Sequence, residues 1–206
     1  GIKKQMQDFQ IHLNEEFEAG KNYKPNKADW LDGKWSGLKK IDKENYQRGK
    51  TSIETTLFHN LGNIITSIPN NLNVHKTVLR MIQNKKESIS KGEGIDWATA
   101  EALAFGSLVS EGFSVRLSGQ DSKRGTFSQR HSAIVDQETE ERFYPLYNIS
   151  PNNHEFGTSK IGNKRKLNHK TNFEVIDSML SEYAVLGYEY GYSLAEPNCL
   201  TLWEAQ

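Results

Sequence analysis

A helix that passes directly into a strand, within residues 95–117, is the feature that most limits how this chain can fold. Asp96 can cap a helix that runs to about Glu111, and Gly112 can end it. In residues 113–117 apolar and polar side chains then alternate, as they do in a β-strand. A helix followed at once by a strand predicts the beginning of an α/β sheet.

A second stretch, residues 173–203, predicts a strand, a helix and another strand in succession. Residues 173–176 form a short apolar run, residues 181–195 have a helical pattern that Pro197 ends, and residues 200–203 are largely apolar again. This order is typical of a parallel crossover. We therefore predict an α/β fold, a three-layer sheet with flanking helices.

The first half of the chain predicts helices and an extended arm. Residues 3–19 carry an apolar stripe at helical spacing that Gly20 can end, whereas residues 22–50 are rich in turn formers and tryptophan. Two further helices are expected, one from about Ile53 to Ile65 and one from Val74 to Ile82. The latter is expected to be opened by one of two asparagines, Asn71 or Asn73.

Charge and composition exclude several classes of protein. The chain has 26 Lys and Arg residues against 26 Asp and Glu residues, which argues against a mainly electrostatic binder of nucleic acid or membrane surfaces. No apolar run approaches the roughly 18 residues of a membrane span. Cys199 is the only cysteine, so the chain can form no internal disulfide and no cysteine-based zinc site, and we expect a reducing compartment.

Motifs for common catalytic sites are absent too. The six histidines show no metal-binding spacing, so we predict no metal site made wholly by this chain. The chain also lacks the motifs of phosphate-binding loops, dinucleotide-binding turns and serine-hydrolase elbows. Two segments remain as candidates for chemistry.

The first candidate is Glu182, in the first turn of the predicted helix that follows a strand. In a structural interpretation, Ser181 caps the helix and the Glu182 carboxylate complements its dipole. In a functional one, Glu182 lies where α/β folds bind ligands, at the carboxyl end of a strand. Leu180, Val185 and Leu186 would surround the carboxyl, and burial favours the protonated form, which can donate to a ring nitrogen. The residues alone support both interpretations equally.

The second candidate is the polar loop at residues 117–131. Its Arg124, Arg130 and His131 could bind an anionic substrate or another subunit. A lone histidine in a loop is more often structural or solvated, and both arginines are equally suited to scaffold ion pairs. These alternatives stay open at this point.

A basic stretch lies at residues 157–170, with five Lys or Arg side chains and no acid. A solvated loop is the favoured interpretation, because no aromatic side chains alternate with the charges. A contact with nucleic acid or with a partner is the alternative.

Eight runs, spread in order over almost the whole chain, form a specific combined pattern: Tyr23-Lys-Pro-Asn-Lys-Ala-Asp-Trp-Leu-Asp-Gly-Lys-Trp-Ser-Gly37, Gly94-Ile-Asp-Trp97, Arg116-Leu-Ser-Gly-Gln-Asp121, Arg124-Gly-Thr-Phe127, Gln129-Arg-His131, Leu180-Ser-Glu182, Tyr188-Glu-Tyr-Gly191 and Leu202-Trp-Glu-Ala-Gln206. Together they resemble the first, decarboxylating component of 2-oxoglutarate dehydrogenase complexes, a thiamine-diphosphate enzyme of the transketolase superfamily. The resemblance covers that family's pyrimidine-binding domain and the linker before it. The basic stretch is longer than the family's usual connection, so we interpret it as a surface insertion.

The resemblance implies domain boundaries and site residues. It makes residues 1–90 the linker and residues 91–206 the pyrimidine-binding domain, which we expect to continue beyond the chain. It matches Glu182 to the family's catalytic glutamate, which shares its proton with a ring nitrogen of the cofactor's aminopyrimidine. It also brings the backbone at Leu180 against that ring and His131 toward the substrate pocket.

The resemblance further implies a cofactor, a reaction and partners. The cofactor is thiamine diphosphate with Mg²⁺, whose diphosphate and metal site lies outside this chain, so the piece alone is expected to be inactive. The reaction is the oxidative decarboxylation of 2-oxoglutarate in the tricarboxylic acid cycle, with succinyl transfer to a lipoyl group. The partners are a second copy, giving a homodimer, and the dihydrolipoyl succinyltransferase component, without nucleic acid or membrane.

Two alternatives to this function stay open. One is the corresponding component for a related 2-oxo acid such as 2-oxoadipate, and the other is a non-catalytic interaction module that uses residues 157–170. The expected location is the cytoplasm in a bacterium, or the mitochondrial matrix in a eukaryote.

Overall fold

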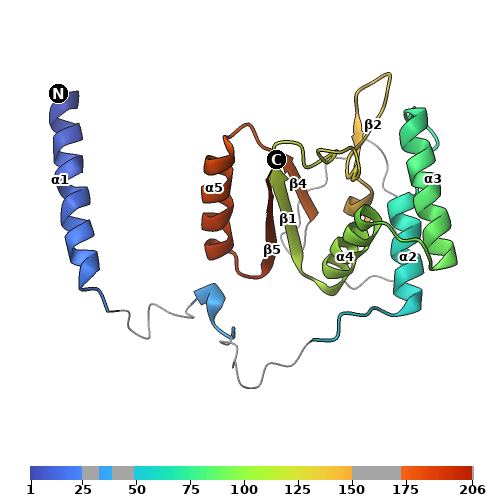
Figure 1. Ribbon diagram of the computed structural model, residues 1–206, viewed down its shortest axis with the longest axis horizontal. Helices are drawn as coiled ribbons and strands as arrows, with labels where there is room; N and C mark the ends of the chain where they lie inside the picture. The colour runs from blue at the N-terminus through green and yellow to red at the C-terminus, as the bar shows by residue number, and fades with distance from the viewer. Residues whose placement is uncertain (25–32, 39–48, 150–172, 206) are drawn as a thin grey trace. The chain divides into compact units, whose positions relative to one another are not determined.

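The computed structural model describes residues 1–24, 33–38, 49–149 and 173–205 (Figure 1). The chain forms two units, Gly1–Tyr46 and Gln47–Gln206. None of the helices in the described ranges is long and apolar enough to cross a membrane. The basic stretch at residues 157–170 lies outside the described residues.

The first unit contains the helix α1 (Ile2–Lys21), which confirms the helix predicted for residues 3–19 and continues past Gly20 (Figure 1). Its apolar stripe is exposed within the described part of this unit, with side chains 46–68% exposed at Met6, Phe9, Leu13 and Phe17. Of the predicted arm, the structure describes residues 22–24, 33–38, 49 and 50, which include the short 3-10 helix η2 (Gly33–Trp35).

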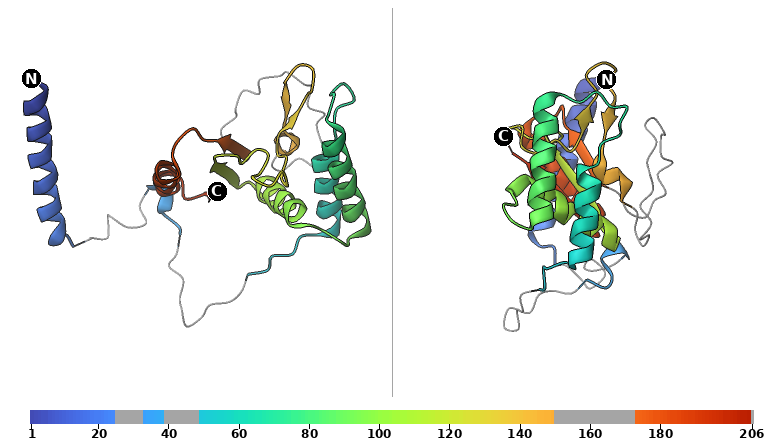
Figure 2. Two further views of the ribbon diagram at one scale, coloured as in Figure 1. Left: turned by 45° about the horizontal axis from the view of Figure 1, so that its top comes forward. Right: turned by 90° about the vertical axis from the view of Figure 1, so that its right-hand side faces the viewer.

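The second unit begins with two packed helices, α2 (Thr55–Thr66) and α3 (Lys76–Lys91), which lie side by side in both views of Figure 2. They approach closely at Gly62, where an added Cβ would collide with the side chain of Ile89. The absence of a side chain at residue 62 therefore lets α3 pack directly on α2.

The prediction that Asn71 or Asn73 opens α3 was wrong. The N-cap is His75, whose Nδ1 accepts a hydrogen bond from the Thr77 N–H at 3.2 Å. Asn73 has other partners, because its N–H donates to Asp136 Oδ2 at 2.7 Å and its side-chain amide donates to Glu138 at 3.0 Å.

The helix and strand predicted around residue 112 are confirmed. In α4 (Trp97–Glu111), the Asp96 carboxylate accepts from the Thr99 N–H at 2.7 Å, and Gly112 ends the helix with φ +99°. The strand β1 (Ser114–Gly119) follows after a single further residue.

β1 is the central strand of a parallel sheet. It pairs on one side with β4 (Phe173–Asp177) and on the other with β5 (Cys199–Glu204), and α5 (Glu182–Ala195) connects those two outer strands. The predicted crossover is therefore parallel, as expected, and it passes over β1. Between β1 and β4 along the chain, β2 (Ile134–Val135) and β3 (Arg142–Phe143) form a small hairpin, followed by the 3-10 helix η3 (Pro145–Asn148).

The sheet lies between α5 and α4, which pack on its opposite faces (Figure 1). Alternation along β1 divides its side chains between the two layers. Val115 and Leu117 enter the main hydrophobic core with residues of α2, α4 and β4, whereas Arg116 and Ser118 face α5. The α/β fold with three layers is thus the architecture predicted from the sequence.

Candidate active site

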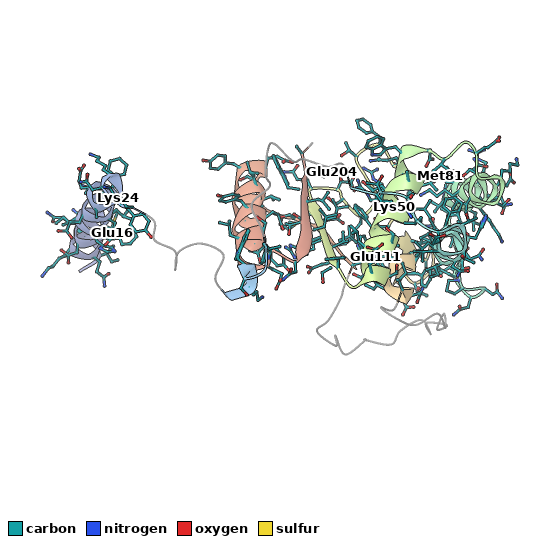
Figure 3. The ribbon with its side chains drawn as sticks, turned by 90° about the horizontal axis from the view of Figure 1, so that it is seen from below. Glu16, Lys24, Lys50, Met81, Glu111 and Glu204 are labelled. Carbon is teal, nitrogen blue, oxygen red and sulfur yellow. The ribbon has the colours of Figure 1, made fainter. Side chains whose placement is uncertain are left out.

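The carboxyl ends of all three parallel strands meet at one edge of the sheet. In the register of the sheet, the last residue of β1, Gly119, lies opposite both Asp177 of β4 and Glu204 of β5. Figure 3 labels Glu204 at the end of its strand. This edge is where open α/β sheets bind their ligands, and both predicted candidate segments begin there.

Hydrogen bonds join the loop after β1 to the loop after β4. The Ser178 N–H donates to the Gly119 carbonyl at 2.6 Å. The Asp177 carboxylate accepts from the Lys123 N–H at 2.9 Å and lies 3.3 Å from the Lys123 ammonium. The two candidate segments are therefore held at the same edge as one assembly.

Glu182 is the first residue of α5, and its carboxyl group is unusual for that position. Ser181 caps the helix by accepting from the Ala184 N–H at 3.4 Å, as predicted. Both carboxyl oxygens of Glu182 are buried and have no hydrogen-bond partner among the described residues. An unpartnered buried carboxyl is costly, by about 1–3 kcal/mol or more. A role limited to the helix dipole gives no reason for that cost, whereas a hydrogen-bonding group from outside this chain would remove it.

Leu180 lies just before that helix, in the loop after β4. Its N–H donates to Ser178 Oγ at 3.2 Å, and its side chain is 47% exposed. Within the described part of the chain, its carbonyl oxygen accepts no hydrogen bond. The Leu180 backbone can therefore offer an acceptor to a ligand at this edge.

A cavity of about 170 Å³ lies between β1, β4 and α5. Leu180 and Ser178 line it from the loop after β4, and Val185 and Glu189 line it from α5. Its wall is mixed, with apolar surface beside hydroxyl and carboxylate groups, as is usual for small-molecule sites.

In the wall of the cavity, Arg116 forms a buried ion pair that joins the sheet to α5. Its guanidinium donates to both oxygens of Glu189, at 2.7 and 2.9 Å, and to Glu174 at 2.5 Å. Ser118 Oγ adds a hydrogen bond to Glu189 at 2.8 Å. Burial alone would lower the pKa of Arg116, but the hydrogen bonds to Glu189 and Glu174 outweigh it and raise that pKa.

The two arginines of the loop after β1 form scaffold ion pairs, one of the two alternatives left open by the sequence. Arg130 donates to Glu101 of α4 at 2.6 Å and to Glu204 of β5 at 2.6 Å, and it is largely buried. Arg124 pairs with Asp121 at the surface. The guanidinium of Arg130 is occupied by these carboxylates, whereas that of Arg124 stays exposed beside Asp121.

His131 lies in the same loop, half-buried and in the left-handed region with φ +48°. Its N–H donates to the Arg124 carbonyl at 3.0 Å. Burial, and then the positive charge of Lys85, lower the pKa of His131 below its ordinary value. Lys85 Nζ in turn donates to the Arg130 carbonyl at 3.1 Å. Both effects favour the neutral form of the imidazole.

The structure places Leu180 and His131 in loops, and Glu182 in the first turn of α5, at one edge of the sheet. Leu180 lines the cavity, whereas Glu182 and His131 do not. Among the described residues no hydrogen bond or ion pair links the side chains of Glu182 and His131. In the same ranges, no three His, Cys, Asp or Glu side chains gather as they would around a metal ion.

Glu189 and its partners Arg116 and Ser118 were not predicted as site residues from the sequence. Glu189 is one of only two buried residues in α5, and its partners on β1 are more than 70 positions away in sequence. One signal was available, since residues seven apart return to the same helix face and Glu189 follows Glu182 by that interval.

Comparison with known proteins agrees with this architecture. Over its whole length the chain is 48% identical to the 2-oxoglutarate dehydrogenase E1 component of Brucella ovis, of which it covers 19%. Over 95% of its length it is 50% identical to the 2-oxoglutarate dehydrogenase E1 component of Brucella anthropi, of which it covers 18%. The chain thus spans about a fifth of the length of these relatives. Residues 93–206 match the family model of the transketolase pyrimidine-binding domain. The chain therefore belongs to the family of transketolase pyrimidine-binding domains.

Proposed function

We propose that this chain is the pyrimidine-binding part of a thiamine-diphosphate-dependent enzyme that decarboxylates 2-oxoglutarate, the first component of a 2-oxoglutarate dehydrogenase complex. The observation that carries the proposal is the buried carboxyl of Glu182, which has no partner among the described residues. An aminopyrimidine ring nitrogen is a partner of the right chemistry, because it can share a proton with a carboxyl group. The identity to two 2-oxoglutarate dehydrogenase E1 components supports the choice of enzyme.

Two residues of this chain would hold the pyrimidine end of the cofactor. Glu182 would share a proton with the ring nitrogen, and this hydrogen bond would fix the tautomer of the ring. The Leu180 carbonyl, which accepts no other hydrogen bond in the described structure, would accept one from the exocyclic amino group. When bound, thiamine diphosphate supplies the carbon nucleophile and the electron sink for the loss of carbon dioxide from a 2-oxo acid.

The protein's part in this chemistry is to hold and move a proton in a site that excludes water. Glu182 has the burial that this task requires, since a carboxyl exposed to water would exchange its proton with solvent. We place the diphosphate and its Mg²⁺ on residues outside this chain, so the 206-residue chain alone would be inactive.

We propose that His131 faces the substrate side of the site. Its support is the position of its loop at the carboxyl edge, together with burial and the charge of Lys85, which favour the neutral imidazole. The N–H of a neutral imidazole can donate a hydrogen bond, and the keto and carboxylate oxygens of a 2-oxo acid are acceptors.

A homodimer is the proposed assembly, with a second copy against the outer face of α5. That face exposes an apolar stripe of Tyr183, Leu186, Tyr190 and Leu194. Gly187 and Gly191 lie beside the stripe, with open space around them that would admit a close neighbour. Burial of these side chains would stabilise the pair. The further partner would be the dihydrolipoyl succinyltransferase component, which receives the succinyl group on its lipoyl arm.

The test of Glu182 is its replacement in the full-length enzyme. With Glu182→Gln, turnover of 2-oxoglutarate is expected to fall by on the order of 10²- to 10⁴-fold while the fold persists. Glu111→Gln, which neutralises an exposed acid at the end of α4, is the matched control and should keep full turnover. Near-normal turnover of Glu182→Gln would refute the assignment. A companion assay on 2-oxoglutarate, 2-oxoadipate and pyruvate identifies the preferred 2-oxo acid.

A second measurement tests the proposed domain boundary. Calorimetry of the 206-residue chain with thiamine diphosphate and Mg²⁺ should give no measurable heat of binding. Micromolar binding would mean that the diphosphate site lies inside this chain.

A further inference from the structure

The inner face of α5 carries two acidic residues that differ in their hydrogen-bond partners. Glu182 and Glu189 are seven residues apart, which places them on one side of the helix and about 10 Å apart along its axis. Glu182 is without a partner in the described structure, whereas both oxygens of Glu189 are bound by Arg116. The unpartnered carboxyl thus lies two helical turns from one that is fully paired.

Apolar packing alone constrains the position of α5 only weakly. Of the 14 residues in the helix, only Val185 and Glu189 are buried. One valine can slide or rotate against a sheet at small cost, because apolar contact is not directional. The second buried contact of α5 is therefore the one that can define its rotation and its position along the axis.

The contacts of Glu189 have the required directionality. Arg116 Nε and Nη2 reach its two oxygens at 2.7 and 2.9 Å, which is the paired geometry of a bidentate ion pair. Ser118 Oγ adds a third hydrogen bond at 2.8 Å. Both partners belong to the central strand, so these bonds fix α5 against the most constrained part of the sheet.

The guanidinium is itself held from several sides. Glu174 of β4 accepts a hydrogen bond from Arg116 Nη1 at 2.5 Å. The ring of Tyr192 lies over the guanidinium with its centroid 4.5 Å from Cζ, and that of Tyr188 lies 5.5 Å away. The guanidinium of Arg116 is thus held in a fixed orientation toward the Glu189 carboxylate.

We propose that Glu189, through Arg116 and Ser118, is the positioning residue that fixes the rotation and axial position of α5 and so directs Glu182 toward the reacting ring. This inference rests on the proposed function of Glu182. Replacement of a buried ion pair by apolar side chains of similar volume is often neutral for stability. The network therefore contributes mainly to the placement of the helix, and little to the free energy of unfolding.

The test is the double variant Arg116→Met with Glu189→Leu, made in the 206-residue chain and in the full-length enzyme. We expect its denaturation midpoint to be unchanged or higher. Turnover should fall on the order of 10²-fold with the KM for 2-oxo acid nearly unchanged, because a displacement of about 1 Å at the reacting group has an effect of this size. Glu111→Gln again serves as the control with normal turnover.

A readout that does not depend on turnover comes from amide spectra of the 206-residue chain. In the parent, the Ala184 N–H donates to Ser181 Oγ and should give one protected resonance. In the double variant we expect multiple or broadened resonances in the first turn of α5 and faster hydrogen exchange there. The more conservative Glu189→Gln, which keeps the shape of the side chain but loses the ion pair, should show the same changes to a smaller degree.

Each outcome decides the proposal. Normal turnover and a single set of α5 resonances in the double variant would overturn it. If the double variant fails to fold, Glu189→Gln decides alone: unchanged turnover and spectra overturn the proposal, and lowered turnover in a folded protein supports it. If Glu182→Gln is active, the proposed function fails, but the amide spectra still test whether Glu189 positions α5.

Discussion

Arg130 and Glu204 form a bidentate ion pair across 74 positions of sequence, in which Nη1 and Nη2 of the guanidinium lie 2.7 and 2.6 Å from the two carboxylate oxygens. The pair joins the loop after β1 to the last residue of β5. Arg130 also donates to Glu101 of α4, so one buried side chain holds three elements at the carboxyl edge of the sheet.

The first prediction follows from this pair. Arg130→Met should lower the free energy of unfolding by about 2–3 kcal/mol, because it leaves the Glu101 and Glu204 carboxylates half-buried without their cation. The measurement is urea denaturation of the 206-residue chain near pH 7. Arg124→Met is the matched control, since Arg124 forms an exposed ion pair with Asp121, and it should change little. Equal effects of the two substitutions would contradict this account.

The second prediction concerns pH and His131. Burial and the charge of Lys85 lower the pKa of the folded imidazole below its ordinary value of 6.5. The unfolded chain therefore takes up this proton at a higher pH than the folded chain. The contribution of His131 to stability should be complete above about pH 6.5 and should be lost as the pH falls below that value.

Urea midpoints between pH 7.5 and pH 5 in the parent and in His131→Asn measure this contribution. Asparagine tolerates the left-handed backbone at this position, so the substitution removes the titrating ring without new strain. The parent should lose more stability than the variant on acidification. Parallel curves would show that His131 titrates alike in the folded and unfolded states.

The third prediction compares two helical glycines, one packed against a neighbouring side chain and one facing open space. Gly62→Ala would place a methyl group against Ile89 and should destabilise the chain by about 1–3 kcal/mol. Gly187→Ala meets open space in the single chain, so the higher helix propensity of alanine should stabilise it by about 0.5–1 kcal/mol. Thermal unfolding of both variants gives the comparison.

The same Gly187→Ala variant tests the proposed homodimer in the full-length enzyme. If a second copy packs closely on the outer face of α5, the added methyl group should weaken the dimer although it stabilises the single chain. Sedimentation at several concentrations measures this. An unchanged dimer would place the contact elsewhere on the molecule.

The secondary-structure elements that could be predicted were those whose ends are set by residues adjacent in sequence. Asp96 and Gly112 marked the ends of α4, because an N-cap and a left-handed C-cap act on neighbouring backbone groups. The N-cap of α3 could not be read in this way. Asn73 has the right chemistry for a cap, but it binds Asp136, a partner 63 positions away, and His75 takes its place.

The same distinction between local signals and long-range contacts applies to the candidate site. Glu182 was identifiable because its position after a strand and at a helix start is visible in sequence. Its lack of a partner and the pairing of Glu189 with Arg116 depend on contacts across the fold, since the latter two residues are 73 positions apart. No pattern of period two or 3.6 contains that information.

The central position of β1 also constrains the order in which the sheet can assemble. β4 and β5 are neighbours along the chain through α5, yet each pairs with β1 and not with the other. The sheet can close only when β5 reaches a strand about 85 positions earlier, which is a slow step because of the loop entropy that it costs. During synthesis, β1 must therefore wait with one edge unpaired until β5 emerges, and a chain cut before Cys199 would keep that edge open to other molecules.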